Sequence, residues 1–212
     1  MFVTADNKLG FIHIPKSGGT SVIDSFNGNV ISVCSTHSAY SEYTGNEPEV
    51  WFATVRHPAA RIHSAFYYQL EWDQKRISGE LGMKAGLTLD FLKERVRLFK
   101  DYGFVNSILD QEVKIKYNDI KRKHNIKVNS FLENLQSSCY FINGCKNIKT
   151  FDIDTNATEL FYWLKSIVTD IEYTHSRKNK NKKFWQDECT PELLDFVKNN
   201  YSDDLERFGY KV

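Results

Sequence analysis

Residues 11–21, with the sequence FIHIPKSGGTS, bring together groups that can hold an anion. An apolar run ends at a proline, and a lysine, a serine, two glycines and two more hydroxyl residues follow. Glycines let the backbone approach an anion closely, hydroxyls add donors, and the N-terminus of a following helix presents unpaired N–H groups. We therefore predict that a phosphate or a similar tetrahedral anion is bound by Lys16, Ser17, Gly18, Gly19, Thr20 and Ser21.

The order of these residues differs from that of the ATPase phosphate loop, in which the lysine follows the glycines. Here Lys16 precedes Gly18 and Gly19. A glycine turn with a solvated lysine is the alternative interpretation. The strand pattern before the loop and the helical pattern after it favour the anion site.

A second segment, VRHPAARIHSAF at residues 55–66, contains groups for another phosphate. Arg56 directly follows a predicted strand, and a helix that begins near Pro58 would place Arg56 at its N-terminus. Arg61 and Ser64 are three residues apart and face one side of that helix. Surface arginines on an amphipathic helix are the alternative. Together, the two segments favour one ligand with two phosphate groups.

The elements that must position these residues alternate between strand and helix, which predicts the α/β class. We expect a single domain over residues 1–212, with a central, mostly parallel sheet flanked by helices and a P-loop-like strand–loop–helix phosphate site. The predicted strands are 9–14, 30–34, 50–55, 139–142 and 148–153. The predicted helices are 20–26, 59–72, 88–99, 156–168 and one C-terminal helix that Thr190 caps and Gly209 ends.

The composition indicates a globular protein, because 41% of the residues are hydrophobic and 14% are aromatic. Lys and Arg total 28 and Asp and Glu total 27, so nucleic acid is not an expected partner. No run of about 18 apolar residues and no signal-like N-terminus occurs, which predicts a cytoplasmic protein without an integral membrane segment. The four cysteines lack zinc-site spacing, so we expect reduced thiols and no bound metal.

The two segments together resemble the sulfotransferase superfamily. HIPKSGGTS resembles the loop that holds the 5′-phosphosulfate of PAPS (3′-phosphoadenosine 5′-phosphosulfate), and VRHPAARIHSAF resembles the segment that holds the 3′-phosphate. The C-terminal NNYSDDLERFGYKV is similar to an ending with Tyr-x-x-Asp and Phe-Gly-Tyr. The likeness is closest to carbohydrate sulfotransferases, Golgi-type and small bacterial, that have a HIPKTGGTS-type loop.

The resemblance implies transfer of a sulfuryl group from PAPS to an acceptor hydroxyl, most simply on a carbohydrate, without a required metal. It implies that residues 16–21 hold the 5′ end, that Arg56 and Ser64 hold the 3′-phosphate, and that Arg61 helps. Two positions depart from the family pattern: Ser17 stands where threonine is common, and His57 stands where Asp or Asn is frequent.

The chemistry needs a group that stabilises the leaving oxygen and a base for the acceptor hydroxyl. Lys16 fits the first role. His37 is the predicted base, because it follows the second predicted strand and a neutral imidazole suits proton removal near pH 7. Glu42 is the alternative base. His13 alternates with apolar residues in its strand and is expected to be structural.

Two other function classes stay open at this point. A nucleotide kinase or ATPase with an unusual phosphate loop would need a metal, for which Asp152 and Asp154 are the candidate ligands. A nucleotide-binding protein of the same fold without activity is the other. The acceptor and the oligomeric state are not predicted, and the basic segments 112–127 and 174–183 fit either an anionic acceptor or a solvated surface.

Overall fold

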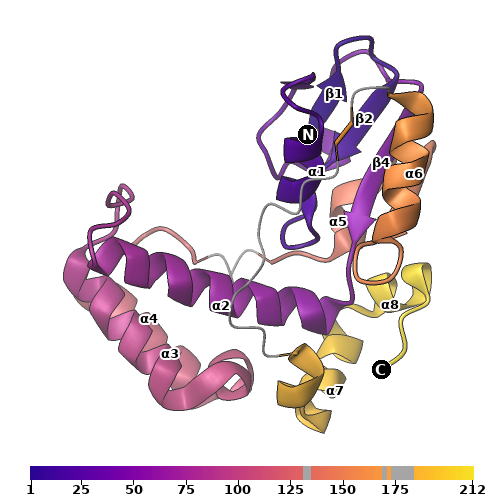
Figure 1. The fold of residues 1–212 in the computed structure, drawn as a ribbon. Helices are drawn as coiled ribbons and strands as arrows, with labels where there is room; N and C mark the ends of the chain where they lie inside the picture. The colour runs from indigo at the N-terminus through magenta and orange to yellow at the C-terminus, as the bar shows by residue number, and fades with distance from the viewer. Residues whose placement is uncertain (131–134, 169–170, 173–183) are drawn as a thin grey trace. The chain divides into compact units, whose positions relative to one another are not determined.

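The computed structural model describes residues 1–130, 135–168, 171–172 and 184–212. The chain forms two compact units, and Figure 1 shows its elements. We call the first the sheet unit; it consists of Met1–Arg61, Gln136–Lys182 and Asp203–Lys211. We call the second the helical unit; it consists of Ile62–Leu135, Lys183–Ser202 and Val212. The basic segment 174–183 lies outside the described residues.

Among the described residues, the sheet unit has one five-stranded sheet with the order β3-β1-β2-β4-β5. The strands are β1 (Phe2–Thr4), β2 (Leu9–Ile12), β3 (Val30–Ser32), β4 (Val50–Val55) and β5 (Ile148–Asp152). The predicted α/β class is confirmed, and the strands predicted at 9–14, 30–34, 50–55 and 148–153 are present. The sheet is mixed, because the sequence analysis missed β1, which pairs antiparallel with both β2 and β3.

The strand directions bring several loops to one edge of the sheet. β2 pairs in parallel with β4, and β4 pairs in parallel with β5. Because β1 runs antiparallel to both of its neighbours, β3 points in the same direction as β2. Lys16, His37, Arg56 and Asp154 therefore follow the carboxyl ends of four strands at the same edge, which is where open α/β sheets bind ligands.

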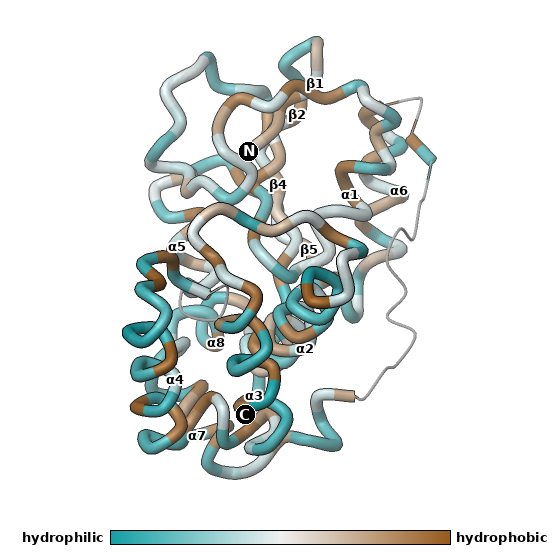
Figure 2. The backbone as a smooth tube through the Cα atoms, turned by 90° about the vertical axis from the view of Figure 1, so that its left-hand side faces the viewer, coloured by the Kyte–Doolittle hydropathy of each residue, from teal (hydrophilic) through white to brown (hydrophobic). Residues whose placement is uncertain are grey.

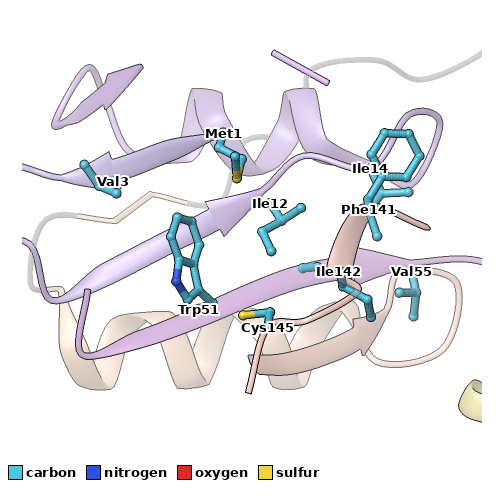
Figure 3. Close-up of a cluster of buried hydrophobic side chains, with 10 residues drawn as sticks. Met1, Val3, Ile12, Ile14, Trp51, Val55, Phe141, Ile142 and Cys145 are labelled. Atoms are coloured by element: carbon cyan, nitrogen blue, oxygen red, sulfur yellow. The ribbon is translucent and has the colours of Figure 1, made fainter. Parts of the chain in front are cut away.

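Helices cover both faces of this sheet. The helices α1 (Gly19–Ser25) and α6 (Ala157–Ile167) pack on one face, in a core cluster that includes Phe11, Val22, Phe52 and Leu160. On the other face, α5 (Ser138–Ile142) contributes to a second cluster, in which Figure 3 shows Trp51, Ile12 and Ile142. The sheet is thus buried on both sides, which explains the nearly continuous apolar sequence of β4.

The prediction of a strand over residues 139–142 is wrong, because this segment is the helix α5. The Ser137 hydroxyl accepts a hydrogen bond from the Tyr140 N–H. The carboxylate of Asp204 accepts the N–H groups of Ser138 and Cys139 at 2.7 and 2.8 Å. These acceptors satisfy the donors that a helix N-terminus leaves unpaired, and Asp204 comes from a distant part of the chain.

The remaining elements of the sheet unit are η1 (Tyr40–Glu42), the start of α2 (Pro58–Ile77), and α8 (Ser202–Phe208) after its first residue. Pro58 occupies the first position of α2, as predicted. The ring of His57 replaces the Asp or Asn expected before it: Nδ1 accepts the Ala59 N–H at 3.2 Å and so caps the helix. The other ring nitrogen, Nε2, lies 3.2 Å from the Lys211 carbonyl oxygen. Because a carbonyl only accepts hydrogen bonds, Nε2 is the nitrogen that carries the proton of the neutral ring.

The helical unit contains the rest of α2 together with α3 (Leu89–Leu109), α4 (Gln111–Lys123), η2 (Trp185–Glu188) and α7 (Pro191–Asn200). α3 is kinked at Gly103, where φ is 71°. Teal and brown alternate along α4 in Figure 2, so this helix is amphipathic. The single helix predicted for the C-terminus is divided in two, because Tyr201 leaves the helical conformation and its hydroxyl donates to the Leu135 carbonyl.

Among the described residues of the helical unit, a buried polar cluster and a partly buried one lie against α2. Arg95 pairs with Asp73 through two hydrogen bonds of 2.8 and 2.7 Å, and both side chains are almost fully buried. Glu188 accepts hydrogen bonds from the Tyr67 hydroxyl and lies 2.9 Å from Nε2 of His63. Both clusters tie α2 to neighbouring segments of the same unit. In the described part of the chain, no helix has the combination of length and apolar character that a membrane span requires.

Candidate active site

The loop between β2 and α1 has an unusual backbone conformation. Lys16 has a φ of 63° and Gly18 a φ of 80°, both in the left-handed region. Glycine adopts this region freely, whereas a residue with a side chain does so at a cost in free energy. Residues held in such conformations concentrate at ligand sites, where the surrounding structure maintains them.

The side chain of Ser17 fits an anion ligand. Its Oγ is fully buried, and among the described residues it has no hydrogen-bond partner. A buried hydroxyl without a partner is costly, so an acceptor supplied by a ligand would satisfy it. Because α1 is only two turns long, its dipole contributes little. The loop donors and the Lys16 ammonium are therefore the main groups that suit a phosphosulfate.

Gly19 is required by the close approach of His13. A Cβ atom at Gly19 would lie 2.0 Å from Cδ2 and 2.2 Å from Nε2 of the His13 ring. That ring is buried and stacks on Phe11 at a centroid distance of 5.8 Å. It also contacts His37 edge-on, with the centroids 4.7 Å apart. His13 thus links the phosphate loop to His37, which agrees with a structural role.

We expect Gly19→Ala to destabilise the protein by about 1–3 kcal/mol, because the His13 ring must move to admit the methyl group. The same movement displaces the loop, so the affinity for a phosphate ligand should fall as well. Thermal unfolding with and without ligand measures both effects.

Gly82→Ala is the matched control, since a Cβ there meets nothing within 4 Å and the change should cost less than about 0.5 kcal/mol. Equal melting temperatures for the two variants would contradict the close packing of His13 against the loop.

His37 has the electrostatic environment of a neutral base. Desolvation is the largest cause that lowers its pKa below the ordinary histidine value, followed by the N-terminal ammonium and by Lys16. The side chain nevertheless remains exposed on one side. A neutral and accessible imidazole at the carboxyl edge of the sheet can accept a proton near pH 7.

Glu42, the alternative base, lies in η1. Its Oε1 accepts the Ala39 N–H at 3.0 Å, so this carboxylate caps its own turn. It is exposed to solvent. The capping bond engages one of its two oxygens and gives this carboxylate a local structural role.

Arg56 follows β4 at the same edge as the phosphate loop and is held by an ion pair. Its Nε lies 2.7 Å from Oδ2 of Asp154, and both side chains are partly exposed. A guanidinium has two further nitrogens that can grip a phosphate. The Oδ1 atom of Asp152 accepts hydrogen bonds from the N–H groups of Asp154 and Thr155 in the turn that follows β5. The two carboxylates considered as metal ligands therefore bind an arginine and a turn.

The spacing of Arg61 and Ser64 predicted that both side chains face the ligand, but the structure places Arg61 elsewhere. Its side chain is fully buried in the sheet unit, and its nitrogens donate to protein acceptors. This placement favours a supporting role over direct contact with a phosphate. Ser64 is half-buried three residues further along α2, beyond the boundary of the sheet unit, and its contact with the ligand stays a prediction.

The sequence did not predict that two acidic residues pair with Arg56 and Arg61. Asp154 pairs with Arg56 across 98 positions of the chain, and Asp204 pairs with Arg61 across 143. The Tyr-x-x-Asp pattern at Tyr201–Asp204 was a signal for the second pair, although it did not identify the partner. Within the described residues, no three His, Cys, Asp or Glu side chains are grouped so that they could hold a metal ion.

The parallel strands β2 and β4 are followed by a lysine–glycine loop and by an arginine at one edge of the sheet, where α/β proteins bind ligands. Comparison with known families gives the particular class: the model described as "Sulfotransferase family" matches residues 1–211, and the chain belongs to this family. It is accordingly a PAPS-dependent sulfotransferase. No curated protein and no solved structure matches the chain.

Proposed function

We propose that the protein transfers the sulfuryl group of PAPS to a hydroxyl group of a carbohydrate. The family match supports sulfuryl transfer from PAPS. The preference for a carbohydrate rests on the HIPKSGGTS loop, which resembles that of carbohydrate sulfotransferases. The same match favours this reaction over the kinase and ATPase alternatives.

In this proposal the sheet unit binds the nucleotide at both ends. Residues 16–21 hold the 5′-phosphosulfate, and Arg56 holds the 3′-phosphate. The observation that carries the proposal is the parallel pairing of β2 with β4, which places the Lys16 loop and Arg56 at one edge of the sheet. One nucleotide with phosphates at its 5′ and 3′ positions suits two neighbouring anion sites.

Lys16 and His37 have complementary roles in the transfer. The Lys16 ammonium stabilises the negative charge that grows on the bridging oxygen as the S–O bond breaks and PAP leaves. Neutral His37 accepts the proton of the acceptor hydroxyl as its oxygen bonds to sulfur. Arg56 exchanges the Asp154 carboxylate for the 3′-phosphate, which charge-assisted hydrogen bonds favour.

The proposal predicts that PAP stabilises the protein more than ATP or ADP does. At 100 times its Kd, PAP should raise the free energy of unfolding by about 2.7 kcal/mol. Thermal unfolding with each nucleotide at the same concentration measures this preference. A larger shift with ATP than with PAP would contradict the assignment of two separate phosphate sites.

The acceptor is tested by incubating the protein with PAPS and a panel of oligosaccharides, tyrosine peptides and simple alcohols. Mass spectrometry should detect an added sulfuryl group on an oligosaccharide. Sulfation of tyrosine peptides or simple alcohols alone would support sulfotransferase activity and would contradict a carbohydrate acceptor. Binding of PAP without turnover on any acceptor would favour a protein that has lost activity.

A further inference from the structure

Arg61 is a buried cation whose donors converge on one small region of the sheet unit. Nε donates to the Pro15 carbonyl at 3.2 Å, and Nη2 donates to the Gln136 carbonyl at 2.9 Å. Nη1 donates to the Ser138 hydroxyl at 2.8 Å and lies 3.3 Å from Oδ2 of Asp204. A guanidinium so engaged has a fixed position, because its planar fork allows few alternative arrangements.

Asp204 balances this charge and connects it to two helices. Its side chain is fully buried, and besides Arg61 it accepts the first N–H groups of α5. The carboxylate therefore joins α8, which carries it, to α5 and to Arg61 at the start of α2. Separation of this buried pair is costly, since loss of either partner leaves an uncompensated charge.

The hydrogen bond from Arg61 to the Pro15 carbonyl links the Arg61–Asp204 pair to the phosphate loop. Pro15 immediately precedes Lys16, whose φ of 63° is a conformation that a lysine does not adopt without support. Arg61 fixes the carbonyl at the peptide bond between these two residues. A strained residue persists when its surroundings determine its conformation, and Arg61 is a buried group that anchors this peptide, beside the hydrogen bond from the Ser17 N–H to the Ile14 carbonyl.

We propose that Arg61, fixed by Asp204, is a positioning residue that holds Lys16 in its left-handed conformation and thereby shapes the phosphate loop. The inference rests on the proposed function for its effect on catalysis. Without this anchor, the peptide between Pro15 and Lys16 relaxes, and the ammonium and the loop amides no longer converge on the anion. Arg61 then acts through Lys16 and does not touch the nucleotide.

The test compares Arg61→Lys with Arg95→Lys, which weakens a buried arginine–aspartate pair of similar geometry in the helical unit. The first readout is hydrogen exchange of the Ser17 and Val22 amides, which donate to Ile14 and Gly18 around the loop. We expect R61K to accelerate their exchange by about tenfold or more, as expected for the loss of a charged hydrogen bond. R95K should lower the melting temperature without this local effect.

The second readout is the Kd for PAP, measured well below both melting temperatures. R61K should raise this Kd and lower kcat, each by about 10- to 100-fold, as misplacement of a binding group does. R95K should leave both within about twofold per folded molecule. Asp204→Asn keeps the shape of the side chain and one acceptor, and it should change both readouts in the same direction as R61K. This variant replaces R61K in the test if R61K does not fold.

The outcomes separate this inference from the proposed function. Unchanged loop exchange in both R61K and D204N would overturn the positioning role, even if the wild-type protein binds PAP. Faster loop exchange in R61K, with no PAP binding by the wild type, would support the positioning role and overturn the proposed function. Equal loop exchange in R61K and R95K would show that Arg61 contributes only to general stability and would overturn the inference.

Discussion

Lys16→Ala is expected to lower kcat by about 10²–10³-fold, which is the usual cost of removing one donor that stabilises a leaving oxygen. The variant should remain folded, because Lys16 is only partly buried and its replacement leaves no cavity in the core. The KM for the acceptor should change little, since the lost interaction strengthens as the S–O bond breaks. Steady-state kinetics with PAPS and an identified acceptor measure these values.

Two further substitutions separate the charge of Lys16 from its backbone. Lys16→Gly also removes the ammonium but suits the φ of 63°, so it should be as inactive as the alanine variant and more stable by about 1 kcal/mol. Lys8→Ala removes an exposed lysine of the same unit that pairs with Asp6, and its kcat should equal that of the wild type. A kcat for K16A within threefold of the wild type would refute the proposed role.

His37→Ala is expected to lower kcat by about 10²–10⁴-fold, the range over which general bases contribute. The rate requires neutral His37, and its surroundings lower the pKa of that ring below the ordinary value of about 6.5. The wild-type rate should therefore fall as the pH drops through a value below 6.5. Rates measured between pH 5 and pH 8 should show this decline in the wild type and not in H37A.

Glu42→Gln distinguishes the two candidate bases. Glutamine keeps an oxygen that can accept the Ala39 N–H, so the turn η1 should survive the change. We expect nearly full activity in E42Q. An inactive E42Q together with an active H37A would transfer the role of the base to Glu42.

The strand–loop–helix around residues 16–21 was predictable because its signal is local. The residues proposed to bind an anion are consecutive in the chain, and the strand before them and the helix after them have clear hydrophobic patterns. β4 was predicted with its observed bounds because all but its first residue are buried, so its apolar run is uninterrupted. The left-handed conformation of Lys16 had no such signal, because lysine is not a residue type that indicates a positive φ.

Local patterns failed where distant residues decide the structure. β1 has only three residues, too few for a periodic pattern, and its pairing with β2 and β3 makes it a strand. The segment Cys139–Ile142 has the apolar and aromatic composition of a strand, and the carboxylate of Asp204 stabilises it as a helix instead. Contacts between residues so far apart in sequence override local propensity.

The role of Arg61 was also beyond a local interpretation. Its spacing from Ser64 predicted that both side chains face the same ligand. In the structure, the acceptors around the Arg61 guanidinium come from residues 15, 136, 138 and 204, all distant in the chain. A spacing of three residues identifies a shared helix face and cannot specify which neighbours pack against it.

The pairing of Arg61 with Asp204 also has a consequence for biosynthesis. The ribosome makes a protein from its N-terminus, so the phosphate loop and Arg61 emerge long before Asp204, whose carboxylate neutralises Arg61. Until then, burial of the guanidinium would leave a cation without its counter-ion inside the nascent core. The sheet unit therefore reaches its native form only after Asp204 has left the ribosome, and a nascent chain that stalls before this residue lacks the finished pair.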